Sequence, residues 1–484
     1  MRETDLVVVG AGAAGLSAAQ EAAKHGLSVT VLDDNLLPGG QYFRRLPIGY
    51  RHTQETVFDK ERGRADALYA TTGQKGVTYL NDAVVWESPE NGVLAFARGA
   101  DSGRIRAKLT IIASGAHDRP APFPGWTLPG VVTAGGLQNL LKGQRVIPGR
   151  RAVVAGNGPL VLLVGATLAR AGAELHEVVE AAPILKRLAG SIADLVAMPK
   201  IVRQAVDYRL AILKSGAKLR TGWTVIEAHG TDELDEVVLA PIDETGKVDR
   251  SRTRTVKADL LVVGFGLMPS IELARLLDCK LNWKPLRGGW VPVRGADFET
   301  SRPGVLAVGD GAGIGGVEMA LREGKLAGVI AAERLGKLSR DQAASLKAPI
   351  QAEIAKVETF RRGLERLYAM PPAFLDLLTP ETIVCRCEDV TAGELRARQD
   401  AGFGSTAALK GTTRTTMGRC QGRNCLRTLS AIIAQQSGQP IEQVMMPRPR
   451  LPARLVTIGD LLQEELPPIE MPKDPHLPRG ERVS

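Results

Sequence analysis

The sequence predicts an α/β protein with two nested Rossmann-like dinucleotide-binding domains and a small α-rich domain after them. Two observations predict the first part: apolar runs at residues 6–9 and 152–155 each lead into a glycine-rich turn. A buried parallel strand, a glycine turn and a helix together form a phosphate-binding unit. The third observation is a cluster of four cysteines within residues 385–425, which predicts a separate domain held by thiol ligands.

Composition excludes several classes of protein. The chain has 484 residues, 44% hydrophobic and 24% charged, as in an average soluble protein. The net charge is +9, but Lys and Arg are scattered, so we expect no nucleic-acid partner. The longest apolar run, 160–169, is too short for a transmembrane segment, and a strand from Asp5 leaves no room for a signal peptide. Because the cysteines do not form a disulfide framework, we expect a cytoplasmic protein.

The first unit has all the parts of a dinucleotide site. Gly10 allows a tight turn, Gly12 lets main-chain N–H groups approach a pyrophosphate, and Gly15 lets the helix pack on the strand. A helix is predicted from 13 to 25, ended by a glycine. Asp33 ends the second strand, where it can accept a hydrogen bond from a ribose.

Three later segments resemble flavoproteins of the thioredoxin reductase and glutathione reductase group. They are Pro38-Gly-Gly-Gln41, the strand end Ile111-Ile-Ala-Ser-Gly115, and the segment 300–310, which ends in Val-Gly-Asp. The resemblance implies that FAD is the cofactor of the first domain. The residues it assigns to FAD are Gly10, Gly12, Ala13, Ala14, Gly15, Asp33, Gly40, Gln41, Val84, Ala113, Ser114, Gly115, Gly309 and Asp310.

The second glycine turn, Gly156-Asn-Gly158-Pro-Leu-Val161, lacks the third glycine. A branched side chain at Val161 is expected to push the helix away from the strand and to distort the phosphate cradle. Glu180 could still hold a ribose. Two interpretations stay open for Gly156, Gly158 and Glu180: an NAD(P)H site with an unusual third position, or an inherited fold that binds another nucleotide or nothing.

The distribution of cysteine and histidine limits the chemistry. Disulfide reductases of this fold carry a redox cysteine pair beside the flavin, whereas this chain has only Cys279 before residue 385. We expect Cys279 to be a small buried apolar residue, and disulfide reduction is excluded. His117 is expected to lie in a loop, with an approach to the flavin region as the alternative, and no catalytic base is predicted.

The cysteine domain follows a charged, periodic segment (336–374) that predicts a helical connector. The thiols form Cys385-x-Cys387 and Cys420-xxxx-Cys425, whereas structural zinc prefers Cys-xx-Cys. Both pairs resemble the [2Fe–2S] domain of bacterioferritin-associated ferredoxin, with zinc or free thiols as the alternatives. Helices are expected at 392–400 and 426–436. Three neighbouring arginines are expected to raise the cluster's reduction potential: Arg386, Arg419 and Arg423.

Nearly the whole chain, including the segment 448–459, resembles the large subunit of multi-subunit bacterial amine and imino-acid dehydrogenases. That family includes octopine, nopaline, D-hydroxyproline and L-proline dehydrogenases and hydrogen cyanide synthase. The resemblance implies a partner (β) flavoprotein subunit related to D-amino-acid oxidases, which oxidises a small-molecule substrate, and a small ferredoxin-like (γ) subunit. Such a complex could lie at the inner face of the membrane.

The function that the resemblance implies is transfer of electrons from flavin to cluster to an external acceptor. The alternatives are an NAD(P)H-dependent ferredoxin-type reductase and a scaffold subunit that does no redox work. The domain boundaries expected are 1–120 and 257–335 for the FAD-binding domain, 121–256 for the middle domain, 336–374 for the connector, 375–445 for the cysteine domain and 446–484 for an extended tail.

Overall fold

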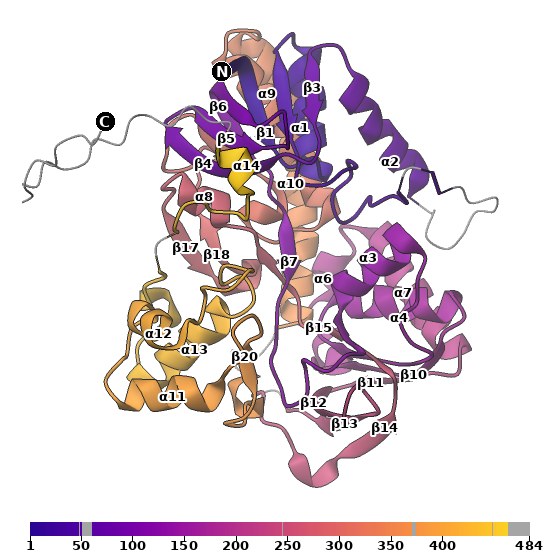
Figure 1. Cartoon of the computed structure of the whole chain (residues 1–484). Helices are drawn as coiled ribbons and strands as arrows, with labels where there is room; N and C mark the ends of the chain where they lie inside the picture. Colours follow the sequence, from indigo (N-terminus) through magenta and orange to yellow (C-terminus); the bar gives the residue numbers. More distant parts are fainter. Residues whose placement is uncertain (48, 51–60, 244, 370–373, 448, 463–484) are drawn as a thin grey trace, which may run out of the picture.

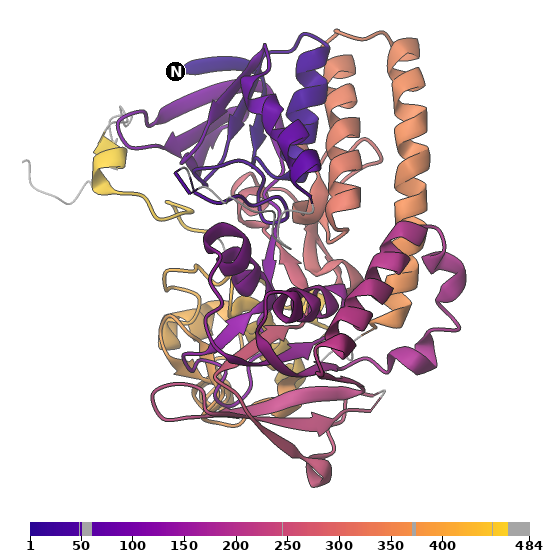
Figure 2. The same ribbon diagram turned by 90° about the vertical axis from the view of Figure 1, so that its right-hand side faces the viewer.

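The computed structural model describes residues 1–47, 49–50, 61–243, 245–369, 374–447 and 449–462. Two α/β lobes lie one above the other, and a small helical domain lies beside the lower lobe (Figure 1). A long helical segment runs along both lobes on the opposite side (Figure 2). The end of the predicted connector and the tail beyond residue 462 fall outside the described residues.

The first lobe is built on a seven-stranded sheet of order β3-β2-β1-β6-β5-β4, with β19 also paired to β6. Strands β1, β2, β3, β6 and β19 are parallel, while β4 and β5 form an antiparallel extension on the first half of β6. The strand bounds are β1 Arg2–Val9, β2 Val29–Leu32, β3 Val77–Leu80, β4 Val84–Glu90, β5 Val93–Ala97, β6 Gly103–Ile112 and β19 Val305–Ala307.

Helix α1 (Ala13–Lys24) lies against α9 (Val317–Arg334), and both cover the first sheet. The contact is close because a Cβ on Gly324 would overlap the carbonyl oxygen of Ala14. Helix α10 (Arg340–Leu367) then runs beside α9 down to the second lobe, which confirms the helical connector (Figure 2). The first lobe also contains α2 (Arg62–Tyr69) and α8 (Glu272–Leu276). Cys279 is buried, as expected.

The second lobe has a parallel sheet of order β11-β10-β9-β15-β8 and an antiparallel sheet of order β12-β13-β14. Because β15 pairs with β9 and β8, the predicted return to the first lobe at residue 257 is wrong by one strand. The bounds are β8 Val131–Thr133, β9 Arg151–Gly156, β10 Glu174–Glu180, β11 Lys218–Thr221, β12 Trp223–His229, β13 Glu236–Pro241, β14 Arg254–Lys257, β15 Leu260–Gly264, α3 Ala134–Gln144, α4 Pro159–Arg170, α5 Ile184–Arg187, α6 Ile192–Leu195 and α7 Pro199–Lys214.

Two short antiparallel strands, β7 (Ala116–Asp118) and β16 (Leu267–Pro269), carry the chain between the lobes. His117 therefore lies on a connecting strand, and its expected place in a loop is wrong. The hairpin of β17 (Leu281–Lys284) and β18 (Gly289–Pro292) follows.

The third domain has its own apolar core, which includes Leu375 and Val444 at its two ends. Helices α11 (Ala392–Asp400) and α13 (Leu426–Ser437) confirm the two predicted helices. The domain also contains β20 (Ile383–Cys385), β21 (Val390–Thr391) and an unpredicted helix, α12 (Thr406–Thr413).

Beyond the third domain the chain returns to the first lobe and ends its described part in α14 (Ile458–Leu462) (Figure 1). There Leu461 packs against Trp86 of β4, and Ser102 donates a hydrogen bond of 2.8 Å to Asp460. None of the helices in the described ranges combines the length and the apolar character needed to cross a bilayer.

Candidate functional site

The glycine turn between β1 and α1 brings together segments that are far apart in the sequence. Gly10 has a φ of +108°, and a Cβ there would overlap the carbonyl oxygen of Ala113. A Cβ on Gly40 would lie 2.9 Å from the Cα of Gly12. The two segments that resemble flavoproteins therefore pack directly on the turn, and only glycine permits these approaches.

The segment after β19 closes the same turn from the other side. Gly309 has a φ of +67°, and its Cβ would lie 2.8 Å from the Cβ of Ala14. Asp310 follows in a 3-10 turn, and its carboxylate accepts hydrogen bonds of 2.8 Å from the N–H groups of Gly315 and Gly316. These bonds fix Asp310 beside the cradle.

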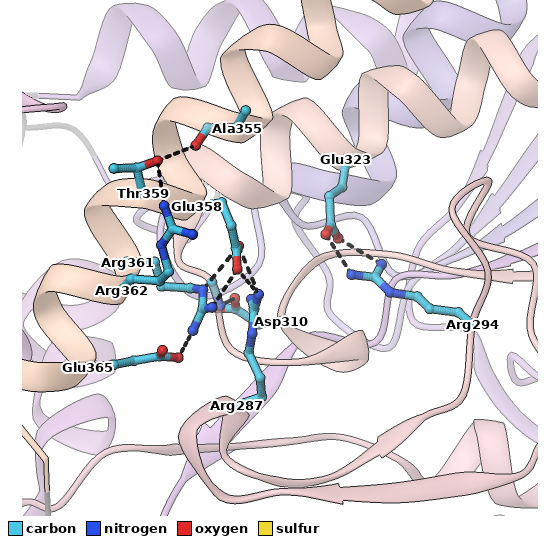
Figure 3. A network of polar contacts seen from close by, with 11 residues as sticks. Arg287, Arg294, Asp310, Glu323, Ala355, Glu358, Thr359, Arg361, Arg362 and Glu365 are labelled. Carbon is cyan, nitrogen blue, oxygen red and sulfur yellow. Dashed lines mark hydrogen bonds and ion pairs between the residues drawn. The ribbon is translucent and has the colours of Figure 1, made fainter. Parts of the chain in front are cut away.

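An ionic network holds this segment in place (Figure 3). Glu323 of α9 accepts a hydrogen bond of 2.8 Å from the N–H of Gly309, and Arg294 pairs with Glu323 at 2.6 Å. Nearby, Arg287 pairs with Glu358 of α10 at 2.6 Å. Hydrogen bonds and ion pairs with arginines outweigh burial and lower the pKa of Glu358 to about 2. Helices α9 and α10 thus anchor the cradle electrostatically.

Asp33 lies at the end of β2, as predicted. Its carboxylate accepts hydrogen bonds from the N–H groups of Ala11 and Asn35, the latter at 2.7 Å. Burial raises the pKa of Asp33. Ala83, the neighbour of Val84, donates a hydrogen bond of 2.8 Å to the carbonyl of Asp33, so the predicted residues Asp33 and Val84 lie close together.

These residues open onto one cleft of ≈ 2510 Å³ between the lobes. An extended dinucleotide needs such a long groove, so the residues present fit FAD. Gly15 does not line the cleft, because it packs on Gly10. The predicted residues that line it are Gly10, Gly12, Ala13, Ala14, Asp33, Gly40, Gln41, Val84, Ala113, Ser114, Gly115, Gly309 and Asp310.

The four clustered cysteines converge at one end of the third domain. The thiol of Cys385 contacts that of Cys425, and the thiol of Cys387 contacts that of Cys420. Among the described residues no three His, Cys, Asp or Glu side chains surround a single metal position. Two thiolates for each iron is the requirement of a [2Fe–2S] cluster, and the two thiol pairs fit it.

The four clustered thiols differ in their exposure to solvent. Cys385 and Cys425 are buried, whereas Cys387 is exposed. The hydrogen bond with Cys425 lowers the pKa of Cys385 to about 6, and the same contact raises the pKa of Cys425. A cluster held here would have one edge near solvent.

Of the three arginines near the cysteines, Arg386 and Arg419 are exposed. Arg423 instead forms a part-buried ion pair of 3.0 Å with Glu272 of α8. The expectation that all three raise the reduction potential is therefore weakened, since Glu272 offsets the charge of Arg423 and solvent screens the other two.

A series of polar contacts leads from the flavin cradle toward Arg423, in the loop that carries the last two cysteines. Ser114 donates a hydrogen bond of 2.7 Å to the carbonyl of Ser270, whose hydroxyl lies 3.3 Å from Nδ1 of His117. Burial lowers the pKa of His117, which lies within the electrostatic range of Glu272 and Arg423. The sequence singled out Ser114 and His117 but not the contacts that link them.

The second glycine turn is better packed than its sequence suggests. Val161 is fully buried, and a Cβ on Gly264 would lie 3.5 Å from its Cγ2. Helix α4 still packs on β9, so the expected displacement of the helix by Val161 is not seen. Gly158 lines the cleft, whereas Gly156 packs against Gly264 and does not reach it.

Glu180 is fully buried at the end of β10 and does not line the cleft. Arg209 lies 3.8 Å away, and neither carboxylate oxygen makes a well-formed hydrogen bond with a described residue. Burial raises the pKa of Glu180 to about 7. The side chain of Asn157 already has a partner, because it donates a hydrogen bond of 2.8 Å to the carbonyl of Tyr368. Of the three residues predicted for the second site, only Gly158 lines the cleft.

Two segments of the chain match known protein families. Residues 4–332 match the family described as pyridine nucleotide-disulphide oxidoreductase, and residues 383–435 match the BFD-like [2Fe–2S] binding domain. The chain belongs to the pyridine nucleotide-disulphide oxidoreductase family. Its cofactors are accordingly FAD in the first lobe and a [2Fe–2S] cluster in the third domain.

Two curated relatives of this family member match over most of its length. Hydrogen cyanide synthase subunit HcnB of Pseudomonas aeruginosa is 31% identical, covering 92% of this chain and 96% of that protein. One of the subunits of opine oxidase from Agrobacterium tumefaciens is also 31% identical, covering 94% of this chain and 91% of that protein. Both relatives are named as subunits of enzymes, the first of a synthase and the second of an oxidase.

The fold is shared with two solved structures. The L-proline dehydrogenase of P. horikoshii matches with a TM-score of 0.68 at 20% identity, covering 95% of this chain and 79% of that chain. The thioredoxin reductase of T. acidophilum matches with a TM-score of 0.50 at 20% identity, covering 69% of this chain and 99% of that chain. The predicted α/β fold with a [2Fe–2S] domain is confirmed.

Proposed function

We propose that this chain is the flavin and iron–sulfur subunit of a multi-subunit dehydrogenase. Its substrate would be a secondary amine, an opine or an imino or amino acid, and its electrons would pass to an external acceptor. The similarity to subunits of opine oxidase and hydrogen cyanide synthase supports the class of reaction. The observation that carries the proposal is that one cleft is lined both by the flavin cradle and by Arg423 and Arg427 of the cysteine domain.

In this proposal each part of the chain has a physical task. Gly10 makes the tight turn, Gly12 lets main-chain N–H groups reach the FAD pyrophosphate, and Asp33 accepts a hydrogen bond from the ribose. Cys385, Cys387, Cys420 and Cys425 hold the cluster, and the exposed edge at Cys387 lets an acceptor approach. When bound, FAD takes up an electron pair and the [2Fe–2S] cluster passes electrons singly.

The proposal places the oxidation of the substrate in a partner. That partner is a flavoprotein subunit related to D-amino-acid oxidases, with a small ferredoxin-like subunit completing the complex. We place the complex in the cytoplasm because all five cysteines are free, as in a reducing compartment. An NAD(P)H-dependent reductase is less well supported, since Gly156 and Glu180 do not line the cleft.

The test is purification of the complex from its host, with flavin and iron measured in each subunit. We expect a second flavoprotein subunit to co-purify, and amine or imino-acid substrates to reduce the cluster under anaerobic conditions, as followed by electron paramagnetic resonance. Stopped-flow mixing with NADH and NADPH is the control. Rapid bleaching of this chain's flavin by either would support the reductase instead, and a chain without flavin or iron would support a scaffold.

A further inference from the structure

Two arginines face the cleft where the first lobe, the connecting strands and the cysteine domain meet. Arg119 directly follows β7, and its N–H donates a hydrogen bond of 2.9 Å to the carbonyl of Gly266. Arg427 lies in the first turn of α13. Both side chains line the cleft, and both are part-buried.

No carboxylate balances these two charges within the described part of the chain. The side chain of Arg119 makes no ion pair or hydrogen bond with a described residue, and burial alone lowers its pKa to about 10. Arg427 likewise makes no ion pair with a described residue, and it lies within electrostatic range of Arg119. Enclosed cations are ordinarily paired, so this pair is missing a partner.

The position of Arg427 at the start of its helix is also electrostatically unfavourable. A cation in the first turn of a helix opposes the helix macrodipole, and α13 has no acidic residue in that turn to offset it. Neutral groups nevertheless hold the guanidinium in place. It donates a hydrogen bond of 2.9 Å to the carbonyl of Gly288, and it lies 5.2 Å from the ring centre of Trp283. The side chain is thus oriented toward the cleft.

We propose that Arg119 and Arg427 form a binding site for the oxyanion of a small molecule, a carboxylate or a phosphate. Two guanidinium groups can donate paired hydrogen bonds to the oxygens of such an anion, and the enclosed setting strengthens each bond. The site would fix the anionic end of a molecule in the cleft between the flavin cradle and the cysteine domain. It requires neither a partner protein nor the proposed substrate class.

The test is isothermal titration of the chain that carries its flavin and iron. The probes are inorganic phosphate and L-proline, each in chloride buffer of constant ionic strength, so that the two sources of an oxyanion are distinguished. We expect saturable binding of at least one probe, with one site per chain. Arg119→Gln and Arg427→Gln should each weaken it by about tenfold or more, because each removes a charged hydrogen-bond donor. The matched control is Arg252→Gln, an exposed arginine of the second lobe.

Flavin and iron content are measured in every variant. If a Gln variant loses either, Arg119→Lys and Arg427→Lys take its place; these keep the charge but lose the planar fork and should also bind more weakly than the parent. Absence of saturable binding of both probes to the parent would overturn the proposal. Equal affinity of the parent and the folded Arg119 and Arg427 variants would overturn it as well.

Discussion

At the scale of single residues, the cysteines separate into one that packs and four that we propose as ligands. Cys279 is buried and donates a hydrogen bond of 3.3 Å to Thr300, far along the chain from the other four. The thiols of Cys387 and Cys420 are in contact at the exposed edge of the cysteine domain. Cys420 and Cys279 therefore provide a test position and a control position for the same substitution.

Cys420→Ser is expected to remove the iron–sulfur visible absorbance and most of the iron while FAD stays bound. The reason is that a hydroxyl is a poorer ligand for iron than a soft thiolate. Iron and flavin content per chain, together with the visible spectrum, check the result. Cys279→Ser is the control and should keep its iron; unchanged iron in Cys420→Ser would disprove the ligand assignment.

Glu180 makes stability depend on pH. Its pKa is raised from 4.5 to about 7, so its contribution is present below pH 4.5 and is lost as pH rises through 7. Glu180→Gln removes this loss and should be more stable than the parent at pH 8 by roughly 3 kcal/mol. Denaturant unfolding at pH 5 and pH 8 measures it. Stability curves that stay parallel at both pH values would contradict the prediction.

At the scale of elements, the contact of α1 with α9 supports the flavin cradle. Gly324 and Gly328 lie one turn apart on α9, where a Cβ would meet the main chain of α1. The small residues let Glu323 reach the N–H of Gly309 at 2.8 Å. The packing of two helices therefore fixes a loop of the site.

Gly324→Ala should lower the free energy of unfolding by about 1–3 kcal/mol or more, because the added methyl overlaps the carbonyl oxygen of Ala14. FAD retention should fall with it, since α1 carries the glycine turn. Thermal unfolding and flavin content are the measurements. Gly63→Ala in α2, where nothing lies within 4 Å of the added carbon, is the control and should be neutral or stabilising.

At the scale of the whole molecule, the cysteine domain is attached to both lobes by a few polar contacts. Trp126 donates a hydrogen bond of 2.7 Å to the carbonyl of Ile383, and Arg423 pairs with Glu272 at 3.0 Å. The second contact joins α8 of the first lobe to the loop that carries the cysteines, so we expect it to help hold that loop against the flavin lobe.

Glu272→Gln should slow reduction of the cluster by the reduced flavin several-fold, because removing the charge weakens the contact by about 1 kcal/mol or more. Anaerobic stopped-flow absorbance measures the rate. Iron and flavin content should not change, which separates positioning from folding. Glu353→Gln, at an exposed ion pair on α10, is the control; an unchanged rate in Glu272→Gln would contradict the positioning role.

Much of the fold and of the flavin site could be predicted because the signals are local. The run into Gly10, the helix after it and Asp33 at the next strand end follow from adjacent residues. The predictions failed where the structure depends on pairing between strands that are far apart in the sequence. The place of β15 in the second sheet depends on β8 and β9, and His117 lies on a strand only because β16 pairs with it.

The sequence by itself determined the fold class and the cofactor class, because glycine turns and thiol spacings act over a few residues, and it predicts that the four clustered cysteines are ligands. Tertiary structure alone decided which of these groups meet. It buried Glu180 away from the cleft, paired Arg423 with Glu272, and placed Arg119 opposite Arg427 across more than three hundred residues of chain. Burial and electrostatic pairing are properties of contacts in space, and sequence spacing does not encode them.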